Sequence, residues 1–191
     1  AALAGLTPDY IVLPKVESAS QVATIHAATN IPVIAMIESP LGVANATAIA
    51  AAPGVAGLFM GNNDLRRDLR IPMDAGRQGL MLALQTVVLA ARLAGVAVFD
   101  GVYNKFADHE GFAAECIEGR NLGFDGKTLI HPSQIDPANA IFGPSEEELA
   151  AAQRLIAAAT GGAERHEGGM IETMHVEQAR ALLARAAGLQ A

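Results

Sequence analysis

The sequence predicts an α/β fold in which parallel strands alternate with helices. Five short runs are continuously apolar, which is typical of strands that are buried on both faces by covering helices. Segments with helical periodicity separate these runs, and this alternation is typical of parallel sheets. The expected strands are residues 10–13, 33–37, 55–60, 96–99 and 128–130, and the expected helices are residues 18–28, 40–51, 75–94 and 108–121.

The first three predicted helices end at residues that disfavour continuation of a helix. Pro32 follows the first helix closely, Pro53 and Gly54 follow the second, and Gly95 follows the third. The third helix has the clearest apolar face, which consists of Leu80, Leu84, Val87, Val88 and Ala91.

The alternation stops near residue 143. We therefore expect a sheet-forming part, residues 1–143, and a helical extension, residues 144–191. Ser145 and Glu148 have the spacing of a capping box, in which each side chain accepts a hydrogen bond from a free N–H at the start of a helix. A polar, glycine-rich connection over residues 163–169 leads to a final helix that begins near Glu172 or Thr173, and this helix could dock on a neighbouring subunit.

Composition excludes several classes of protein. The net charge of −7 argues against non-specific binding to nucleic acid, since no basic stripe is visible. The apolar content of 51% suits a packed globular core rather than disorder. Cys116 is the single cysteine, so an internal disulfide is excluded, and we expect a small half-buried thiol in a reducing compartment. No signal peptide or membrane-length apolar run is visible, and a cytoplasmic location is expected.

Five strands leave two architectures open. A (β/α)8 barrel has about 250 residues, so the barrel reading requires further strands on the N-terminal side. An open doubly wound sheet is the alternative, although no G-x-G-x-x-G follows any predicted strand, which weakens its dinucleotide-binding version.

Two carboxylates follow neighbouring predicted strands at the point where each strand ends. Glu38 comes directly after residues 33–37, and Asp64 follows residues 55–60 after a short turn. Carboxyl ends of barrel strands carry the active site. Oxygen ligands without paired Cys or His favour Mg²⁺ over zinc. Either residue could instead cap a following helix, but together they favour a metal site.

Groups that suit an anion lie at the same predicted edge. The backbone N–H groups of Gly61, Asn62 and Asn63 could bind a carboxylate where a strand leads into a helix, and an ordinary turn explains them equally well. Lys15 ends the first predicted strand and could meet an anion.

Two further polar residues end predicted strands. Asp100 ends the fourth strand and His131 ends the fifth. Pro132 restricts His131 to an extended backbone, and an isolated histidine in such a place is more often structural than catalytic.

The chain resembles the citrate lyase beta-subunit-like family of the HpcH/HpaI aldolase superfamily, which includes malyl-CoA and citramalyl-CoA lyases. The resemblance covers nearly the whole chain, and its specificity comes from the order of short motifs. The matching segments are Ile11-Val12-Leu13-Pro14-Lys15-Val16-Glu17, Met36-Ile37-Glu38-Ser39-Pro40, Gly61-Asn62-Asn63-Asp64-Leu65, Asp100-Gly101-Val102-Tyr103, the long run from Gly123 to Ile135, and Phe142-Gly143-Pro144-Ser145.

This resemblance implies a TIM-type (β/α)8 barrel, of which the chain covers roughly strands 4 to 8 before its helical extension. It implies Mg²⁺ on the residues Glu38 and Asp64, a CoA thioester and a small oxo acid as ligands, and a homotrimer or a dimer of trimers. The expected contacts of substrate or CoA are Lys15, Gly61, Asn62, Asn63 and His131, and the expected catalytic residues are Asp100 and Glu172.

Two features depart from the family pattern. The three strands that normally come first, with an arginine near the substrate, are absent from this sequence. The Met-Ile-Asp motif that supplies an acid/base to a neighbouring subunit here reads Met170-Ile171-Glu172. Glu172 keeps the carboxylate but adds a methylene, and catalytic geometry is sensitive to such a change. Its alternative role is an acid that opens the last helix.

The sequence therefore predicts a Mg²⁺-dependent lyase that cleaves a 3-hydroxyacyl-CoA to an acyl-CoA and an oxo acid, with Glu172 or water as the proton carrier. Thioesterase activity on the same kind of substrate stays open. A CoA-independent pyruvate-type aldolase of the same superfamily is one alternative, and a non-catalytic subunit that binds CoA or a partner protein is another.

Overall fold

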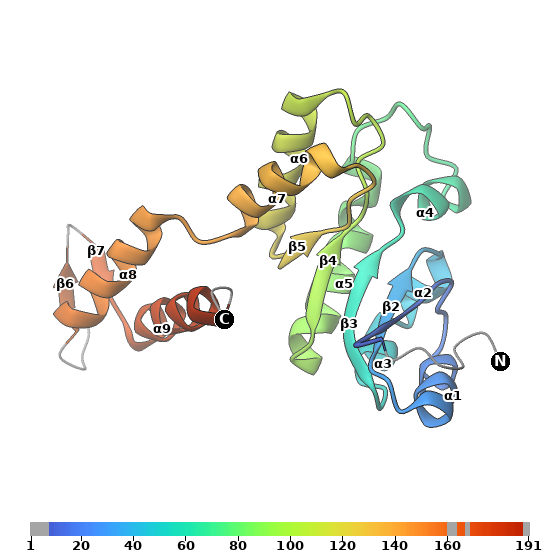
Figure 1. Cartoon of the computed structure of the whole chain (residues 1–191), viewed down its shortest axis with the longest axis horizontal. Helices are drawn as coiled ribbons and strands as arrows, with labels where there is room; N and C mark the ends of the chain where they lie inside the picture. The colour runs from blue at the N-terminus through green and yellow to red at the C-terminus, as the bar shows by residue number, and fades with distance from the viewer. Residues whose placement is uncertain (1–7, 160–163, 167–168, 189–191) are drawn as a thin grey trace. The chain divides into compact units, whose positions relative to one another are not determined.

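The computed structural model describes residues 8–159, 164–166 and 169–188 of the 191. The chain divides into two compact units, Ala1–Ala138 and Asn139–Ala191. The first unit contains the parallel sheet, and the second contains helices and a small hairpin (Figure 1). The boundary expected after residue 143 stays a prediction. No helix in the described part of the chain is long and apolar enough to span a membrane.

The first unit is an α/β structure built on one five-stranded parallel sheet, as expected. The strands lie in the order β1-β2-β3-β4-β5, each paired in parallel with its neighbours in sequence. A doubly wound sheet reverses this order at a switch point, whereas a barrel adds its strands in succession. The strands are β1 (Ile11–Leu13), β2 (Val33–Ile37), β3 (Val55–Met60), β4 (Ala97–Asp100) and β5 (Gly126–Lys127).

The fifth strand differs from its prediction. The apolar run at residues 128–130 is not a strand, and β5 is formed instead by Gly126 and Lys127, which pair with Phe99 and Asp100 of β4. A strand of glycine and lysine carries no apolar signal. The apolar pattern therefore predicted the strand two residues too far along the chain, at residues 128–130.

Helices follow the strands of the sheet. Contacts place α1 against β2, α3 and α5 against β3, and α6 against β5, and Figure 1 shows this succession. The helices of this unit are α1 (Ala19–Thr29), α2 (Pro40–Ala44), α3 (Ala46–Ala50), α4 (Asn62–Asp68), the 3-10 helix η1 (Gln78–Leu80), α5 (Met81–Ala94), α6 (His109–Leu122) and the 3-10 helix η2 (Pro132–Gln134); α7 (Ile135–Phe142) crosses the boundary between the units.

Two predicted helices are shorter or broken. The helix expected over residues 40–51 is divided into α2 and α3 at Asn45, whose side-chain amide donates to the Glu17 carbonyl. The helix expected from residue 75 begins as η1 at Gln78, because Arg77 is drawn away into a buried ion pair with Asp100. Helix α4 begins where the sequence analysis placed a transition from strand to helix, whereas α7 was not expected.

The two faces of the sheet are covered unequally. A row of Ala35, Leu58 and Val98, which are in register across three strands, is fully buried. Ile34 and Met36 point to the opposite face of β2 and are only half-buried. The prediction of strands buried on both faces is therefore met fully on one face of the described sheet, whereas the second face is apolar and half-buried.

The second unit contains α8 (Glu146–Ala158), the antiparallel pair β6 (Glu164–His166) and β7 (Gly169–Ile171), and α9 (Thr173–Gly188). The predicted capping box is present, with the Ser145 hydroxyl accepting from the Glu148 N–H and the Glu148 carboxylate accepting from the Ser145 N–H. The final helix begins at Thr173, as expected. The β6–β7 pair lies where an irregular connection was expected.

Cys116 is more deeply buried than expected. The side chain is fully buried in α6, and this burial raises the pKa of its thiol to about 11. Thiolate is the nucleophilic form of cysteine, so the thiol is a small apolar side chain of the core.

Candidate functional site

The carboxyl ends of the five strands bring the predicted polar residues to one edge of the sheet. Lys15 follows β1, Glu38 follows β2, and Gly61 leads from β3 into α4. Asp100 is the last residue of β4, and Lys127 is the last residue of β5. Parallel strands end on the same side, so residues that are far apart in sequence form one polar edge.

Glu38 is buried, with 8% of its surface exposed, and its orientation is fixed by the loop that follows β1. The Lys15 N–H donates to Glu38 Oε1 at 2.7 Å, and the Lys15 backbone is left-handed, with φ 54°. This backbone costs roughly 1–2 kcal/mol for a residue other than glycine. Among the described residues no hydrogen bond reaches Glu38 Oε2, so this oxygen remains available to a ligand.

The same loop is held against the end of β2 by further hydrogen bonds. The Ser39 hydroxyl donates to Glu17 Oε1 at 2.6 Å, and the Val16 N–H donates to the Met36 carbonyl at 3.2 Å. The segments around Lys15 and Glu38 are therefore one structural unit, although 23 residues separate the two.

Gly61 is required by the close approach of β3 to Glu38. A Cβ atom at this position would lie 2.3 Å from Glu38 Cβ and 2.9 Å from Oε2. Gly61 is also the N-cap of α4 and offers no side chain to the first N–H groups of that helix. Such groups need another acceptor, which agrees with the predicted role of the amides near Asn62 and Asn63 without testing it.

Asp64 lies in the first turn of α4 between two cations. Its carboxylate is 3.1 Å from the Arg67 guanidinium and 3.7 Å from the Lys15 ammonium. Lys15 thus contacts both candidate metal ligands, Glu38 through its backbone and Asp64 through its side chain.

The donor set fits a hard divalent cation. No group of three or more His, Cys, Asp or Glu gathers anywhere in the described ranges, and the candidate ligands at this edge are the two carboxylates Glu38 and Asp64. Mg²⁺ commonly uses one or two protein carboxylates and completes its octahedron with water and substrate oxygens. The free Glu38 Oε2 beside Gly61 supplies an oxygen of the required kind.

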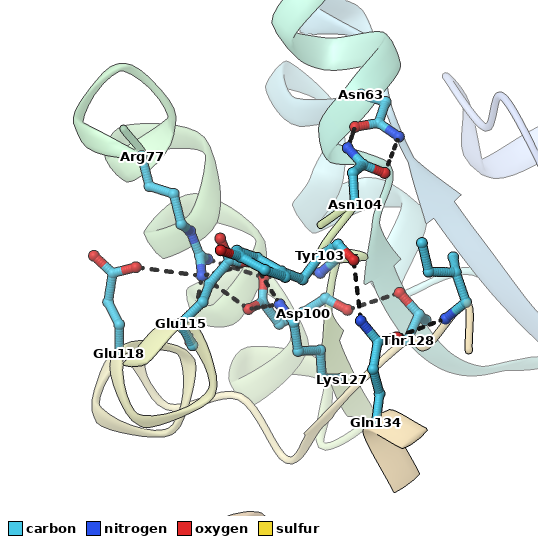
Figure 2. A network of polar contacts seen from close by, with 12 residues as sticks. Asn63, Arg77, Asp100, Tyr103, Asn104, Glu115, Glu118, Lys127, Thr128 and Gln134 are labelled. Carbon is cyan, nitrogen blue, oxygen red and sulfur yellow. Dashed lines mark hydrogen bonds and ion pairs between the residues drawn. The ribbon is translucent and has the colours of Figure 1, made fainter. Parts of the chain in front are cut away.

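Asp100, predicted as catalytic, lies in a buried charge cluster (Figure 2). Its carboxylate accepts two hydrogen bonds from Arg77, at 2.9 and 3.0 Å, and one from the Lys127 ammonium at 2.9 Å. The side chains of Asp100 and Lys127 are fully buried. Because its oxygens are already occupied, the geometry suits a positioning role for Asp100 better than direct proton transfer; its catalytic role stays a prediction.

The cluster extends to helix α6. Lys127 also contacts Glu115 at 2.7 Å, and Arg77 lies 3.3 Å from Glu118. We call Arg77, Asp100, Glu115, Glu118 and Lys127 the buried charge cluster. The sequence analysis did not identify the two cations of this cluster, Arg77 and Lys127. The position of Lys127 inside the long Gly123–Ile135 motif is the one sequence feature that could have indicated its role.

Two amide contacts order the loops above this cluster (Figure 2). Asn63 and Asn104 exchange a pair of side-chain hydrogen bonds, at 2.7 and 3.2 Å, which joins the start of α4 to the loop after β4. Gln134 is almost fully buried, and its amide donates to the Tyr103 carbonyl and accepts from the Ile130 N–H. Gln134 therefore attaches the end of the long motif to the same loop.

Tyr103 is held as a neutral phenol. Its hydroxyl donates to Asp108 at 2.6 Å, which raises the pKa of Tyr103 to about 12 and lowers the pKa of the Asp108 carboxyl. A phenol with this pKa stays protonated at neutral pH and donates its single proton to Asp108.

His131 lies four residues beyond β5 rather than at its end, because the strand is displaced from its predicted position. The imidazole is exposed and stacks on Phe106, with ring centroids 5.1 Å apart and planes inclined by 17°. Its Nδ1 atom is 2.8 Å from the Ser133 hydroxyl. The pair presents a flat aromatic surface.

Glu172, the other predicted catalytic residue, belongs to the second unit. Its side chain is exposed, and its backbone N–H donates to His175 Nδ1 at 2.9 Å just before α9. These contacts involve the backbone of Glu172 and leave its carboxylate facing solvent.

Comparison with known proteins extends over nearly the whole chain. The HpcH/HpaI aldolase/citrate lyase family profile matches residues 1–132. A (3S)-malyl-CoA thioesterase of Cereibacter sphaeroides is 44% identical over 199 aligned residues, which cover 100% of this chain and 70% of the relative. A citrate lyase subunit beta-like protein of Deinococcus radiodurans is 37% identical, with 97% and 70% covered.

A solved structure resembles the chain equally broadly. The protein CitE of Mycobacterium tuberculosis, crystallised with magnesium, acetoacetate and coenzyme A, superposes with a TM-score of 0.84 at 35% identity. The match covers 97% of this chain and 71% of that one.

Proposed function

The chain belongs to the HpcH/HpaI aldolase/citrate lyase family, and from this premise we propose that it is a Mg²⁺-dependent enzyme that cleaves a 3-hydroxyacyl-CoA into an acyl-CoA and an oxo acid. The observation that carries the proposal is the pairing of Glu38 and Asp64 through Lys15 at the carboxyl edge of the sheet. Magnesium accompanies several solved relatives, with coenzyme A, acetoacetate or oxaloacetate.

We propose that the sheet is the part of a TIM-type barrel that comprises strands 4 to 8. The sequential strand order supports this assignment, as does the half-buried apolar face that carries Ile34 and Met36. In a closed barrel this face would be the packed interior. A homotrimer or dimer of trimers is proposed as the assembly, on the family resemblance alone.

Glu38 and Asp64 would hold the metal, which supplies a Lewis acid for the oxygens of the bound acid. Glu38 is already oriented by the Lys15 N–H, and Gly61 keeps the space beside Oε2 open. The N–H groups at the start of α4, near Asn62 and Asn63, would bind the carboxylate of the oxo acid. The Lys15 ammonium, exposed at this edge, would meet an anionic part of the substrate.

The remaining predicted residues take supporting roles in this proposal. Asp100 would hold Lys127 and Arg77 in place and so fix the loops around the site. The stacked surface of His131 and Phe106 suits the flat adenine base of CoA. Glu172 would carry a proton for the site of a neighbouring subunit.

Hydrolysis of the thioester is the second candidate, because the relative at 44% identity is a thioesterase. An assay of products from (3S)-malyl-CoA separates the two reactions. A lyase forms acetyl-CoA and glyoxylate, whereas a thioesterase forms malate and free CoA. We expect acetyl-CoA only when Mg²⁺ is present and none after addition of EDTA. Formation of malate and free CoA would show that the enzyme hydrolyses the thioester. Turnover of a 4-hydroxy-2-oxo acid, without turnover of any CoA thioester, would favour the CoA-independent aldolase.

The role of Glu172 is tested by Glu172→Gln. The substitution preserves size and the two backbone contacts with His175 but removes a titratable group. Loss of a general acid or base typically costs 10²–10⁴-fold in rate, so we expect a fall of about 100-fold in kcat. Glu177→Gln removes the same charge from an exposed position on α9 and is the matched control. Equal rates in the two variants would leave Glu172 as a helix-end acid.

A further inference from the structure

Helix α5 has two apolar faces, and only one of them packs on the sheet. The first face is buried against β3, β4 and the neighbouring helices α3 and α6. The second presents Leu82, Thr86, Leu89 and Leu93, and its three leucines are between 62% and 83% exposed. Single exposed leucines are common on protein surfaces, but a contiguous row of them marks a contact site. We call these four residues the α5 stripe.

An apolar groove borders the amino-terminal half of the α5 stripe. It lies between α2, α4 and α5, its volume is about 440 Å³, and every residue that lines it is uncharged. Leu69 and Leu82 form part of its walls and are both exposed, so the groove opens on the same surface as the stripe. A cavity of about 150 Å³ already binds benzene, so the groove has room for a leucine side chain.

The α5 stripe brings neither a charge nor an unpaired donor to a contact. The Thr86 hydroxyl donates to the Leu82 carbonyl at 2.7 Å, within its own helix. Arg92, the one charged residue of α5, is paired with Asp125 at 2.7 Å. A helix that binds an anionic membrane surface carries several Lys or Arg residues beside its apolar face, and α5 does not. The stripe therefore suits an apolar protein surface.

Further strands of the same sheet would not cover the α5 stripe. Strands β3 and β4 are inner strands, each paired on both sides, and α5 packs on them in contact with α3 and α6. Additional strands would join at the free edges of β1 and β5, and their helices would pack there. A cover for the outward face of α5 must therefore come from outside the sheet-forming unit.

The α5 stripe is complementary to a second copy of itself. Its residues are four, three and four positions apart, which is the spacing of helices that pack on another helix and reads the same in both directions. In an antiparallel contact about a twofold axis, Leu82 faces Leu93 and Thr86 faces Leu89 of the other copy. Each copy then places its Leu93 against the groove that begins at Leu82 of the other. A parallel contact would place groove against groove and leave both unfilled.

The area of this contact is that of a weak interface. A fully exposed leucine side chain presents roughly 100 Å² of apolar surface, so the exposed leucines of the stripe and the groove contribute about 250 Å² from each copy. Both copies together bury about 500 Å² through these leucines, to which the groove walls add, whereas standard interfaces bury about 1,200–2,000 Å². We propose that the α5 stripe and its groove pair two copies of this chain in antiparallel orientation, with a Kd of about 10 µM. This pairing does not depend on the proposed function.

Sedimentation equilibrium of the whole chain, from about tenfold below to about tenfold above this Kd, tests the pairing. We expect the mass of the wild-type protein to rise toward twice that of Leu93→Glu, because a carboxylate loses its hydration in an apolar groove. The factor of two is expected whether single chains or trimers pair. Ile117→Glu, at a half-exposed position on α6, is the matched control and should behave like the wild type. Equal masses of the wild type and Leu93→Glu at every concentration overturn the proposal.

Circular dichroism checks that Leu93→Glu folds, and the exposed Leu89→Glu repeats the test if it does not. Crosslinking determines the orientation of the two copies. Cys116 is fully buried, so Leu82→Cys and Leu93→Cys each present one reactive thiol. In the antiparallel contact these two positions face each other, whereas the two copies of Leu82 are separated by about 16 Å along the helix axis. A bismaleimide with a short spacer should join the mixed variants and leave each variant alone largely unjoined. Equal crosslinking of Leu82→Cys alone would overturn the antiparallel pairing.

Discussion

Glu38→Gln is expected to lower Mg²⁺-dependent turnover of a 3-hydroxyacyl-CoA about a thousandfold. The amide oxygen of glutamine can still accept from the Lys15 N–H, so the loop after β1 should keep its place. The change removes the negative charge that a hard cation requires. Metal ions contribute several kcal/mol to stabilisation of a transition state, and each 1.4 kcal/mol corresponds to a factor of ten. Initial rates over a Mg²⁺ titration, together with calorimetry of Mg²⁺ binding, measure the effect.

Glu17→Gln is the matched control for this experiment. Glu17 belongs to the same loop and accepts from the Ser39 hydroxyl, a bond that glutamine can also accept. The substitution Glu17→Gln removes one negative charge from the same loop without altering a proposed metal ligand. We expect Asp64→Asn to behave like Glu38→Gln. Unchanged Mg²⁺ affinity in both Glu38→Gln and Asp64→Asn would refute the proposed metal site. The fold and the family assignment would be unaffected.

Asp100→Asn is expected to destabilise the first unit by about 3 kcal/mol, since breaking a buried ion pair leaves an uncompensated charge. Asparagine has the same size but presents an NH₂ group, which cannot accept, toward the Arg77 and Lys127 donors. Glu115 and Glu118 only partly replace the lost charge, because they approach the cations from α6. Urea unfolding followed by circular dichroism measures the free energy of unfolding.

Asp68→Asn provides the comparison for an exposed ion pair. Asp68 contacts Arg67 at 2.9 Å, and the Arg67 side chain is 62% exposed, so its removal should cost less than about 1 kcal/mol. Similar losses in the two variants would mean that water reaches the buried charge cluster. In that case the positioning role proposed for Asp100 would have no energetic basis.

The strand pattern was predictable because most of the sheet is apolar. Residues 33–37 and 55–60 were predicted to be strands and are the strands β2 and β3. The failure at β5 has a physical cause. Lysine is usually a surface residue, yet the side chain of Lys127 is fully buried because Asp100 and Glu115 neutralise its charge. Those partners lie 27 and 12 residues away, beyond the reach of any local pattern.

The candidate site was predictable only in part. The positions of Glu38 and Asp64 follow from the rule that strand ends carry functional residues, and the structure links both to Lys15. Arg77 was placed inside a predicted helix because its sequence neighbours suit one. Its actual position depends on Asp100, 23 residues later.

The buried charge cluster also constrains how this sequence can change over generations. Its five residues come from the segment before η1, from β4, from α6 and from β5. A lineage that loses one buried charge passes through an intermediate with an unbalanced partner, which costs several kcal/mol of a total stability of only about 5–15 kcal/mol. The four segments are therefore expected to diverge together, with a change at Lys127 or Arg77 accompanied by a compensating change at Asp100 or Glu115.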